Sequence, residues 1–184
     1  MRKLKIHELN RLTPEQYRES EKTPLVLLLD HVRSLNNVGS LFRTADAFRL
    51  EAIYLCGITA VPPHPEIHKT ALGAEDTMEW HDVPDAVEAI RTLKQKGYIP
   101  YALEQTEGSC PLDRLTLNPA RKYVLALGHE VRGVQQAVID ACDCCVEIPQ
   151  WGTKHSLNVA VAGGIAVWEF CRRLSPQHAD NAPV

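Results

Sequence analysis

The amino-acid sequence predicts an α/β domain with a mostly parallel sheet and helices on both of its faces. Short continuous apolar runs such as PLVLLLD, AIYLCG and KYVLALG alternate with helical patterns such as PDAVEAIRTLKQKG and GVQQAVIDA. Parallel strands that are covered on both faces show continuous apolar runs, and helices supply the crossovers between them. The chain has 184 residues, 45% of them hydrophobic, which is enough for one domain with a substantial core.

The two ends of the chain differ in composition from the middle. Residues 1–23 are polar, and we interpret them as a basic, partly helical extension; LTPEQ predicts a helix with Thr13 as N-cap and Pro14 at the first helical position. Residues 24–174 form the predicted domain. The tail, residues 175–184, lacks an apolar period, and we expect it to be flexible.

Helices and loops alternate between the predicted strands. VPPHPEIHKTALGA and EQTEGSCPL are interpreted as loops, and PDAVEAIRTLKQKG as a helix closed by Gly97. CCVEIP predicts a late strand. A final helix is expected from about residue 156 to residue 173.

The segment SLNNVGSLFRTADAF, residues 34–48, predicts a helix with two different faces. At about 100° per residue, one side is apolar and faces the core; it carries Val38, Leu41, Phe42, Ala45 and Phe48. The opposite side is a shallow strip over which a ligand, another chain or a backbone could pass closely; it carries Gly39, Ser40, Arg43, Asp46 and Ala47. An arginine on such a strip is well placed to bind a partner.

The overall charge limits the kinds of partner. The net charge of −3 and the pI near 6.2 exclude a surface that is basic all over, so nucleic-acid binding needs a local basic patch. No apolar stretch of the sequence reaches 18 residues, and no leader pattern is visible. We therefore expect a cytoplasmic protein with no membrane partner.

Several common motifs are missing from the sequence. It has no G-x-x-x-x-G-K-[ST], G-x-G-x-x-G, G-x-S-x-G or H-E-x-x-H pattern, so P-loop NTPases, dinucleotide dehydrogenases, α/β-hydrolases and zincins have no support. The histidines are scattered, and the cluster of Cys142, Cys144 and Cys145 has no second pair at zinc-site spacing. We expect no metal, and we interpret the six cysteines as buried thiols in a reducing compartment.

Three unusual segments follow predicted strands: DHVRSLNNVGSLFRTA, LGHEVRGV and IPQWGTKHSLNVAVAGG. Ligands of open parallel sheets gather beyond the carboxyl ends of the strands, which is where these segments lie. Taken singly, their polar residues have ordinary interpretations: Asn37 as a helix cap, Arg43 paired with Asp46, Glu130 as a carboxylate at a helix N-terminus, and Ser156 as a cap followed by Asn158. These interpretations do not explain why such residues gather at one edge of one sheet.

Together the three segments resemble the motifs of the SpoU/TrmH family of RNA ribose 2′-O-methyltransferases, within the SPOUT superfamily. Asn37, Gly39 and Arg43-Thr44-Ala45 are similar to the first motif, LGHEVRGV to the second and IPQWGTKHSLNVAVA to the third. The resemblance spans residues 24–173 in the family's order and spacing. Three residues depart from it: Gln150 and Trp151 stand where a methionine and a small or polar residue are frequent, and Ala160 stands where a serine is common.

The resemblance implies a deep trefoil knot over about residues 123–173 and S-adenosylmethionine (AdoMet) as the methyl donor, with no metal. Family members bind AdoMet in a bent conformation within the knot, largely through backbone groups. The corresponding contacts in this sequence are expected at Leu103, Glu104, Leu127, Gly128, Ile148, Gln150, Ser156 and Leu157. The resemblance also implies a homodimer, with the first and last helices of the domain at the interface and a site completed across it.

The same resemblance assigns catalysis to Arg43, Asn37, Glu130, Ser156 and Asn158. A ribose 2′-hydroxyl has to be positioned and deprotonated, whereas the sulfonium of AdoMet already activates the methyl group. A guanidinium is a poor base, so Arg43 is expected to clamp the adjoining phosphate, with the proton lost to that phosphate or to a transiently neutral Arg43. Asn37, Ser156 and Asn158 would orient Arg43 and the ribose, and Glu130 would fix the loop of the second motif.

RNA is the expected partner, with tRNA favoured over ribosomal RNA. Family members that act on ribosomal RNA often carry an extra N-terminal domain, whereas short forms resemble the enzymes that methylate a D-loop guanosine of tRNA. A basic cleft could be formed by Arg2, Lys3, Lys5, Arg11, Arg18, Lys22, Arg33, Arg43, Arg132 and Lys154, although the first six fit a solvated helix face equally well. The alternatives are a ribosomal RNA methyltransferase and a non-catalytic knotted protein that binds RNA or assists assembly.

Overall fold

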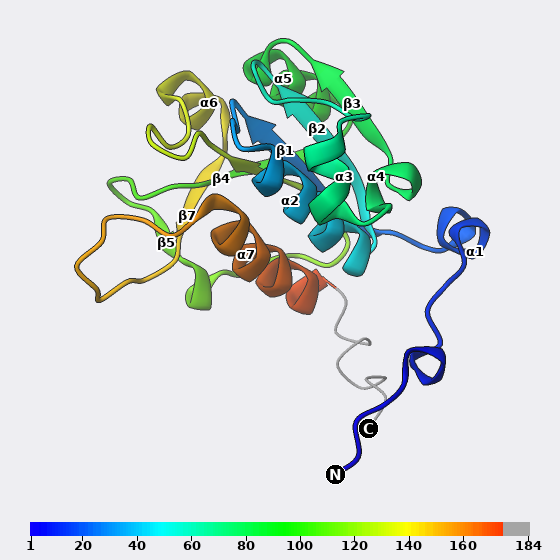
Figure 1. The fold of residues 1–184 in the computed structure, drawn as a ribbon. Helices are drawn as coiled ribbons and strands as arrows, with labels where there is room; N and C mark the ends of the chain where they lie inside the picture. Colours follow the sequence, from blue (N-terminus) through cyan, green and yellow to red (C-terminus); the bar gives the residue numbers. More distant parts are fainter. Residues whose placement is uncertain (175–184) are drawn as a thin grey trace.

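The computed structural model describes residues 1–174, and a seven-stranded sheet forms the centre of the domain (Figure 1). The strands are β1 (Thr23–Asp30), β2 (Leu50–Cys56), β3 (Trp80–Val83), β4 (Tyr98–Leu103), β5 (Cys110–Pro111), β6 (Lys122–Leu127) and β7 (Cys144–Glu147). Their order across the sheet is β3-β2-β1-β6-β4-β7-β5, and every neighbouring pair is parallel. The predicted α/β class with a mostly parallel sheet is confirmed.

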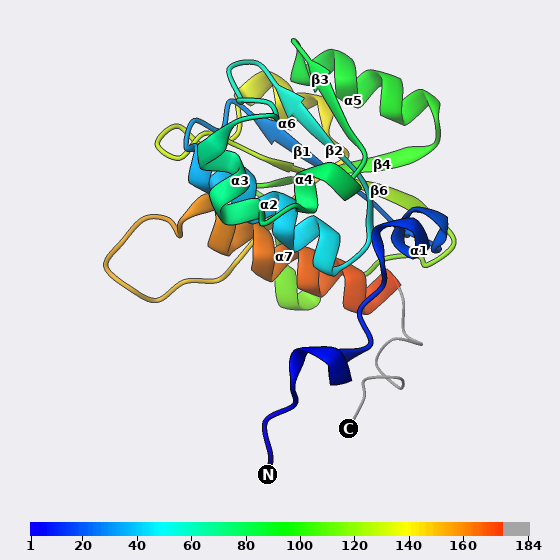
Figure 2. The same ribbon diagram turned by 45° about the vertical axis from the view of Figure 1, so that its right-hand side comes forward.

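Helices cover both faces of this sheet (Figure 2). One face carries α2 (Leu35–Ala47), α3 (Pro65–Ala71), α4 (Ala74–Thr77) and α7 (Val159–Leu174), and the other carries α5 (Ala86–Gln95) and α6 (Gln136–Ala141). Strand β1 alternates between the two cores, because Leu25, Leu27 and Leu29 pack on the α2 side while Val26 and Leu28 pack on the α5 side. Burial on both faces is why this strand reads as a continuous apolar run.

The strand order brings three distant segments to one edge of the sheet. Strand β6 lies between β1 and β4, and β7 follows beyond β4, so their carboxyl ends at Asp30, Leu127, Leu103 and Glu147 point the same way. The loops after β1, β6 and β7 are those of the three sequence motifs. Crevices at such strand ends are the usual ligand sites of open α/β sheets.

Three local predictions were wrong. VPPHPEIHKTALGA contains helix α3 instead of being only a loop: Pro65 stands at its first position, and the backbone N–H of Glu66 donates to Nδ1 of the cap residue His64 at 3.2 Å. The final helix begins at Val159, not near residue 156. The EQTEGSCPL loop includes the short strand β5, and a 3₁₀ helix at Leu112–Arg114 follows it.

The N-terminal segment contains a 3₁₀ helix at Ile6–Leu9 and the helix α1 at Pro14–Glu19. The predicted helix start is confirmed, since Thr13 Oγ1 accepts from the Gln16 N–H at 3.3 Å and Gln16 Oε1 accepts from the Thr13 N–H at 2.9 Å. Tyr17 is buried and its hydroxyl donates to Met78 Sδ at 2.7 Å, so α1 is attached to the domain core. Figures 1 and 2 show the residues before α1 extending away from the domain.

Several sequence-based expectations are not tested by this arrangement. The domain boundary at residue 24 and the knot over about residues 123–173 stay predictions, and the predicted tail, residues 175–184, lies outside the described residues. Within residues 1–174, no helix is long and apolar enough to cross a membrane. Of the six free cysteines, Cys56 and Cys171 are buried and the other four are only partly buried, which corrects the expectation that all are interior thiols.

Candidate active site

The first motif begins α2 with a cap that the sequence did not identify. Ser34, and not Asn37, is the N-cap residue, because Ser34 Oγ accepts from the Asn37 N–H at 3.4 Å. The Asn37 side chain is therefore free of a capping role. It projects from the first turn of α2 towards the loop that follows β6 and donates from Nδ2 to Glu130 Oε1 at 3.0 Å.

Glu130 ties the second motif to the first. Its two carboxylate oxygens also accept from backbone N–H groups at the start of α2, from Ser34 at 2.8 Å and from Arg33 at 3.1 Å. Burial alone would raise the pKa of this carboxyl, but the N–H groups of Ser34 and Arg33 and the Asn37 amide outweigh it and lower the pKa to about 2. Glu130 is therefore a fixed carboxylate at neutral pH, and it is not a proton carrier.

Asn158 ties the third motif to the other two. Its Oδ1 accepts from the N–H groups of Ala160 at 2.9 Å and Val161 at 3.2 Å, so Asn158 caps α7, a position that the sequence had offered to Ser156. Its Nδ2 donates to Asn37 Oδ1 at 3.1 Å. Because Asn37 donates to Glu130 and accepts from Asn158, one chain of hydrogen bonds joins all three motifs.

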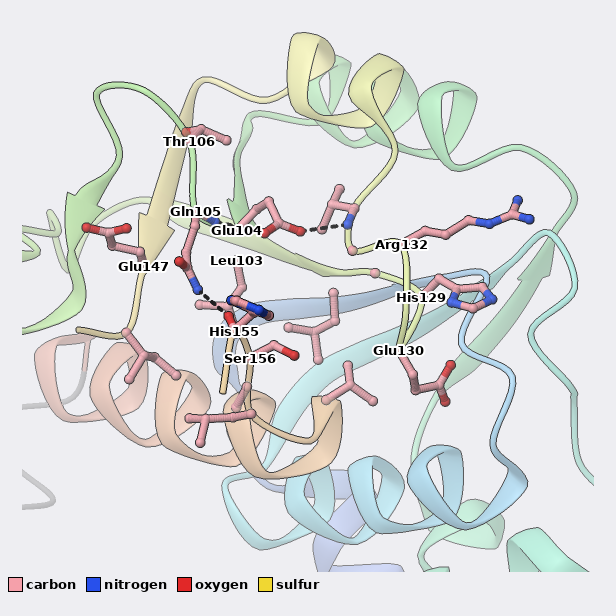
Figure 3. Close-up of a pocket in the computed structure, with 18 of the residues that line it drawn as sticks. Leu103, Glu104, Gln105, Thr106, His129, Glu130, Arg132, Glu147, His155 and Ser156 are labelled. Atoms are coloured by element: carbon pink, nitrogen blue, oxygen red, sulfur yellow. Dashed lines mark hydrogen bonds between the residues drawn. The ribbon is translucent and has the colours of Figure 1, made fainter. Parts of the chain in front are cut away.

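A pocket of about 480 Å³ lies beside Glu130, at one end of this chain of hydrogen bonds. Figure 3 shows the side chains that line it, Glu130 among them. It is lined by the loops after β4, β6 and β7, by α6 and by the start of α7. All eight residues expected to contact a cofactor line it: Leu103, Glu104, Leu127, Gly128, Ile148, Gln150, Ser156 and Leu157. Glu130 lines the same pocket. These eight residues, which are up to 54 positions apart in the sequence, from Leu103 to Leu157, thus meet in one hollow.

The wall formed by the second motif depends on two glycines. The loop folds back on itself, with the His129 N–H donating to Gly133 O at 3.0 Å and the Gly133 N–H donating to His129 O at 2.8 Å. A Cβ on Gly128 would lie 2.2 Å from backbone atoms of Gly133 and Val134, and Gly133 has a φ of +68°. Glu104 Oε2 closes the loop by accepting from the Val134 N–H at 2.9 Å.

The wall formed by the third motif is more open. Every residue from 150 to 158 is exposed, and Figures 1 and 2 show this loop extending outward between β7 and α7. One contact holds it to the β4 end of the pocket, where Gln105 Nε2 donates to His155 O at 3.1 Å. Ser156 lines the pocket but makes no hydrogen bond within residues 1–174.

Arg43 stands apart from the other four predicted catalytic residues. It is exposed and lines a second hollow, whose lining shares no residue with the pocket of Glu130 and Ser156. The strip around it is also not open along its whole length. Gly39 is buried beneath α3, where a Cβ would lie 2.2 Å from Thr70 Oγ1 and 2.3 Å from Ile67 O. At Gly39, therefore, the chain segment expected to pass closely over this strip is helix α3 of the same domain.

One polar cluster at the same edge was missed by the sequence analysis. Asp30 is fully buried at the end of β1, and its carboxylate accepts from the Gln135 backbone N–H at 3.3 Å and from Gln135 Nε2 at 2.9 Å. His31 Nδ1 lies 2.7 Å from Asp30 Oδ1, and His31 has a φ of +59°. A charged residue that ends the apolar run PLVLLLD was the available signal. This cluster anchors the second-motif loop against β1.

No group of three or more histidine, cysteine, aspartate or glutamate side chains that could hold a metal ion occurs in residues 1–174. The candidate site has three parts. They are a pocket lined by apolar side chains, carboxylates and backbone groups, the hydrogen-bonded chain of Glu130, Asn37 and Asn158, and Arg43 in a separate hollow.

Comparison with known proteins agrees with the motif assignment. The model of the SpoU rRNA Methylase family matches residues 24–168. The chain belongs to this family. The matched SpoU region runs from the start of β1 into the second half of α7, so it includes the whole sheet and all three motifs.

Among curated SpoU relatives, a 23S rRNA (guanosine-2'-O-)-methyltransferase RlmB from Nitrosomonas europaea is 36% identical over 153 residues, which is 82% of this chain and 57% of the relative. The chain thus spans less than two thirds of that relative's length. An AdoMet-bound rRNA methyltransferase from Sinorhizobium meliloti superposes with a TM-score of 0.75 at 28% identity, over 89% of this chain and 61% of that one.

A shorter solved relative matches over nearly its whole length. This structure, described as giving insights into the 2-OH methylation of C/U34 on tRNA, superposes with a TM-score of 0.72 at 25% identity and covers 83% of this chain and 97% of that one. Proteins similar to this chain are therefore named for ribosomal RNA and for tRNA.

Proposed function

We propose that this chain is an AdoMet-dependent RNA ribose 2′-O-methyltransferase. The observation that carries the proposal is the hydrogen-bonded chain of Glu130, Asn37 and Asn158, which draws three motifs from distant parts of the sequence around one pocket. Membership of the SpoU family and the names of its relatives support the same reaction.

The pocket fits AdoMet in size and in chemistry. Its volume of about 480 Å³ lies within the range of about 300–1,000 Å³ that is usual for small-molecule sites. Leu103, Leu127 and Ile148 offer apolar surface for an adenine ring, and Glu104 and Glu147 offer carboxylates near a ligand that carries a sulfonium and an ammonium. When bound, AdoMet supplies a methyl group that its sulfonium has already activated.

The residues of this chain would prepare the ribose for the transfer. In the proposed transfer, the 2′-oxygen would bond to the methyl carbon as the carbon–sulfur bond breaks, and the hydroxyl proton would have to leave. Arg43 would bind the adjoining phosphate and hold the hydroxyl in line, and the proton would pass to that phosphate or to a transiently neutral Arg43. Glu130 and Asn158 fix both ends of the Asn37 amide, so Asn37 would present a rigid polar group beside the ribose, together with Ser156.

Two observations support a homodimer with a site completed across its interface. Arg43 lies outside the pocket of its own chain. In addition, α7 exposes an apolar stripe at helical spacing, with Val161, Ile165 and Trp168 exposed by 53%, 41% and 56%. Covering such a stripe with a second copy would remove apolar surface from water, and the proposed dimer requires that Arg43 of one protomer then lie near the pocket of its partner.

The names of the relatives favour ribosomal RNA as the substrate over the tRNA D-loop guanosine expected from the sequence. Two curated relatives, at 36% and 29% identity, are each named 23S rRNA (guanosine-2'-O-)-methyltransferase RlmB. Methylation of tRNA is the second candidate, favoured by the structural relative concerned with C/U34 of tRNA. A knotted binder without catalysis is the remaining alternative, and the complete set of motif residues argues against it.

Transfer of a labelled methyl group from AdoMet to separate pools of unmodified ribosomal RNA and tRNA tests the proposal. A ribose 2′-O-methyl group blocks alkaline cleavage of the neighbouring phosphodiester, so label should be recovered in an alkali-resistant dinucleotide from ribosomal RNA. Label in tRNA alone would reverse the order of the two substrates. Label that is not alkali-resistant, or no label in either pool although AdoMet binds, would contradict the proposed reaction.

A further inference from the structure

The hollow beside Arg43 holds a second cation that the sequence motifs do not include. It measures about 480 Å³, and it is lined by Ser40, Arg43, Thr44, Ala47, Phe48, Lys69 and Thr70. Arg43, Ser40 and Thr44 come from α2, whereas Lys69 and Thr70 come from α3. No carboxylate is among these lining residues, so two positive side chains share one concave surface.

Gly39 is the reason that α3 lies so near to Arg43. With no side chain at this position, the backbone of Ile67 and the hydroxyl of Thr70 approach α2 to distances that a Cβ would not allow. Thr70 Oγ1 then donates to Asn36 O at 3.1 Å and holds the two helices in register. The first motif thus supplies Arg43 and also the close helix contact that brings Lys69 beside it.

The charges in this hollow are weakly compensated. Arg43 makes no hydrogen bond or ion pair within residues 1–174. Lys69 Nζ lies 3.8 Å from Glu66 Oε2, and the two side chains are 70% and 48% exposed. Such a long, solvent-exposed ion pair compensates little of the lysine charge and contributes little to stability. Asp46, the partner considered for Arg43, instead accepts from Thr77 Oγ1 at 3.2 Å.

The hydroxyl groups of the hollow cannot replace these cations as donors. Ser40 Oγ donates to Asn36 O at 2.7 Å, Thr44 Oγ1 donates to Ser40 O at 3.0 Å, and Thr70 Oγ1 donates to Asn36 O. Their hydrogens are engaged by the backbone, so only Arg43 and Lys69 can donate to a ligand from side chains here. Two such donors without a nearby carboxylate select an anion.

We propose that Lys69 is an RNA-binding residue that contacts a backbone phosphate next to the one held by Arg43, so that the hollow between α2 and α3 receives two consecutive phosphates. This inference rests on the proposed function. The two cations divide their work: Arg43 acts on the nucleotide that is methylated, and Lys69 secures the strand beside it. Lys69 contributes affinity and leaves the chemical step to the other residues.

Lys69→Met tests this division, since it removes the charge and keeps most of the apolar stem. The matched control is Lys96→Met, an exposed lysine that follows α5 on the opposite face of the sheet. Both variants and Lys69→Arg are compared with the wild type in methyl transfer, using whichever RNA pool accepts label, and in binding of the same RNA over a range of salt concentrations.

Lys69→Met should raise KM for RNA about three- to fivefold with kcat within about twofold, and should lower the slope of log affinity against log salt by about 0.7–0.9. Lys69→Arg should restore both values, and Lys96→Met should match the wild type. Equal KM and slope in Lys69→Met and Lys96→Met would overturn the inference while leaving the proposed function intact. So would a loss of kcat at unchanged KM. A wild type that methylates no RNA would instead overturn the proposed function.

Discussion

Glu130→Gln should destabilise the protein in a way that depends on pH. The substitution keeps the size of the side chain but removes the charge and turns an amide NH₂ towards the N–H donors of Ser34 and Arg33. The ordinary pKa of 4.5 falls to about 2 in the folded protein, which at about 1.4 kcal/mol per pH unit corresponds to about 3 kcal/mol. Because Glu130 is only partly buried, solvent screening reduces this to about 1–2 kcal/mol.

The sign of the pH effect follows from the lowered pKa. A carboxyl whose folded pKa is depressed contributes its full stability above pH 4.5, and the contribution is lost as the pH falls towards 2. Urea unfolding followed by circular dichroism should therefore show Glu130→Gln less stable by about 1–2 kcal/mol at pH 7, with the difference from the wild type shrinking below pH 4.5.

Glu107→Gln is the matched control, because Glu107 is exposed and makes no hydrogen bond within residues 1–174. It should stay within about 0.5 kcal/mol of the wild type at every pH. A Glu130→Gln variant as stable as this control at pH 7, or a deficit that persists unchanged under acid conditions, would refute the assigned charge and hydrogen bonds of Glu130.

Three further predictions follow from single contacts. Gly39→Ala should lower the free energy of unfolding by about 1–3 kcal/mol, since its Cβ would meet Thr70 Oγ1 and Ile67 O. Gly152→Ala is the control and should stay near the wild type, because a Cβ there has nothing within 4 Å. Equal thermal unfolding of the two variants would contradict the packing of α3 against α2. Asn158→Ala removes the α7 cap and should lower the free energy of unfolding by about 1 kcal/mol, whereas Asn158→Asp keeps the cap but cannot donate to Asn37. Both variants should slow methyl transfer, but only Asn158→Ala should be less stable in urea. Equal stability of the two variants would argue against the cap. Burial raises the pKa of the Cys56 and Cys171 thiols to about 12. After treatment of the folded protein with an alkylating reagent at pH 8, mass spectrometry should therefore find neither thiol modified. Rapid alkylation of either thiol in the folded protein would contradict its burial.

The sequence specified the sheet well because its strands are buried on both faces. Runs such as PLVLLLD and KYVLALG became β1 and β6 at the centre of the sheet. Elements without a strong period were missed. Helix α3 begins at Pro65 after the cap residue His64, a sequence that suggested a loop although proline is acceptable at a first helical position, and β5 has only two residues.

The site was predicted as a set of residues but not as a set of contacts. The resemblance to the SpoU/TrmH motifs implied the residues that line the pocket and those that form the hydrogen-bonded chain. The sequence alone could not show that Ser34 caps α2. It also could not show that Glu130 accepts from backbone N–H groups 96 and 97 residues earlier in the chain. Such bonds depend on where two loops meet, and backbone donors carry no mark in a sequence. Lys69 was missed for a similar reason, because its position follows from the α2–α3 contact at Gly39.

The most direct test of the account is the rate of methyl transfer by Arg43→Ala, measured together with AdoMet affinity by calorimetry. Arg91→Ala serves as the control, because Arg91 is an exposed residue of α5, on the opposite face of the sheet from α2, and lines neither hollow. Because Arg43 lines a hollow separate from the predicted cofactor pocket, Arg43→Ala should bind AdoMet as the wild type does and lose about a hundredfold in transfer to RNA. A loss of less than about tenfold, with AdoMet binding intact, would contradict the central role of Arg43.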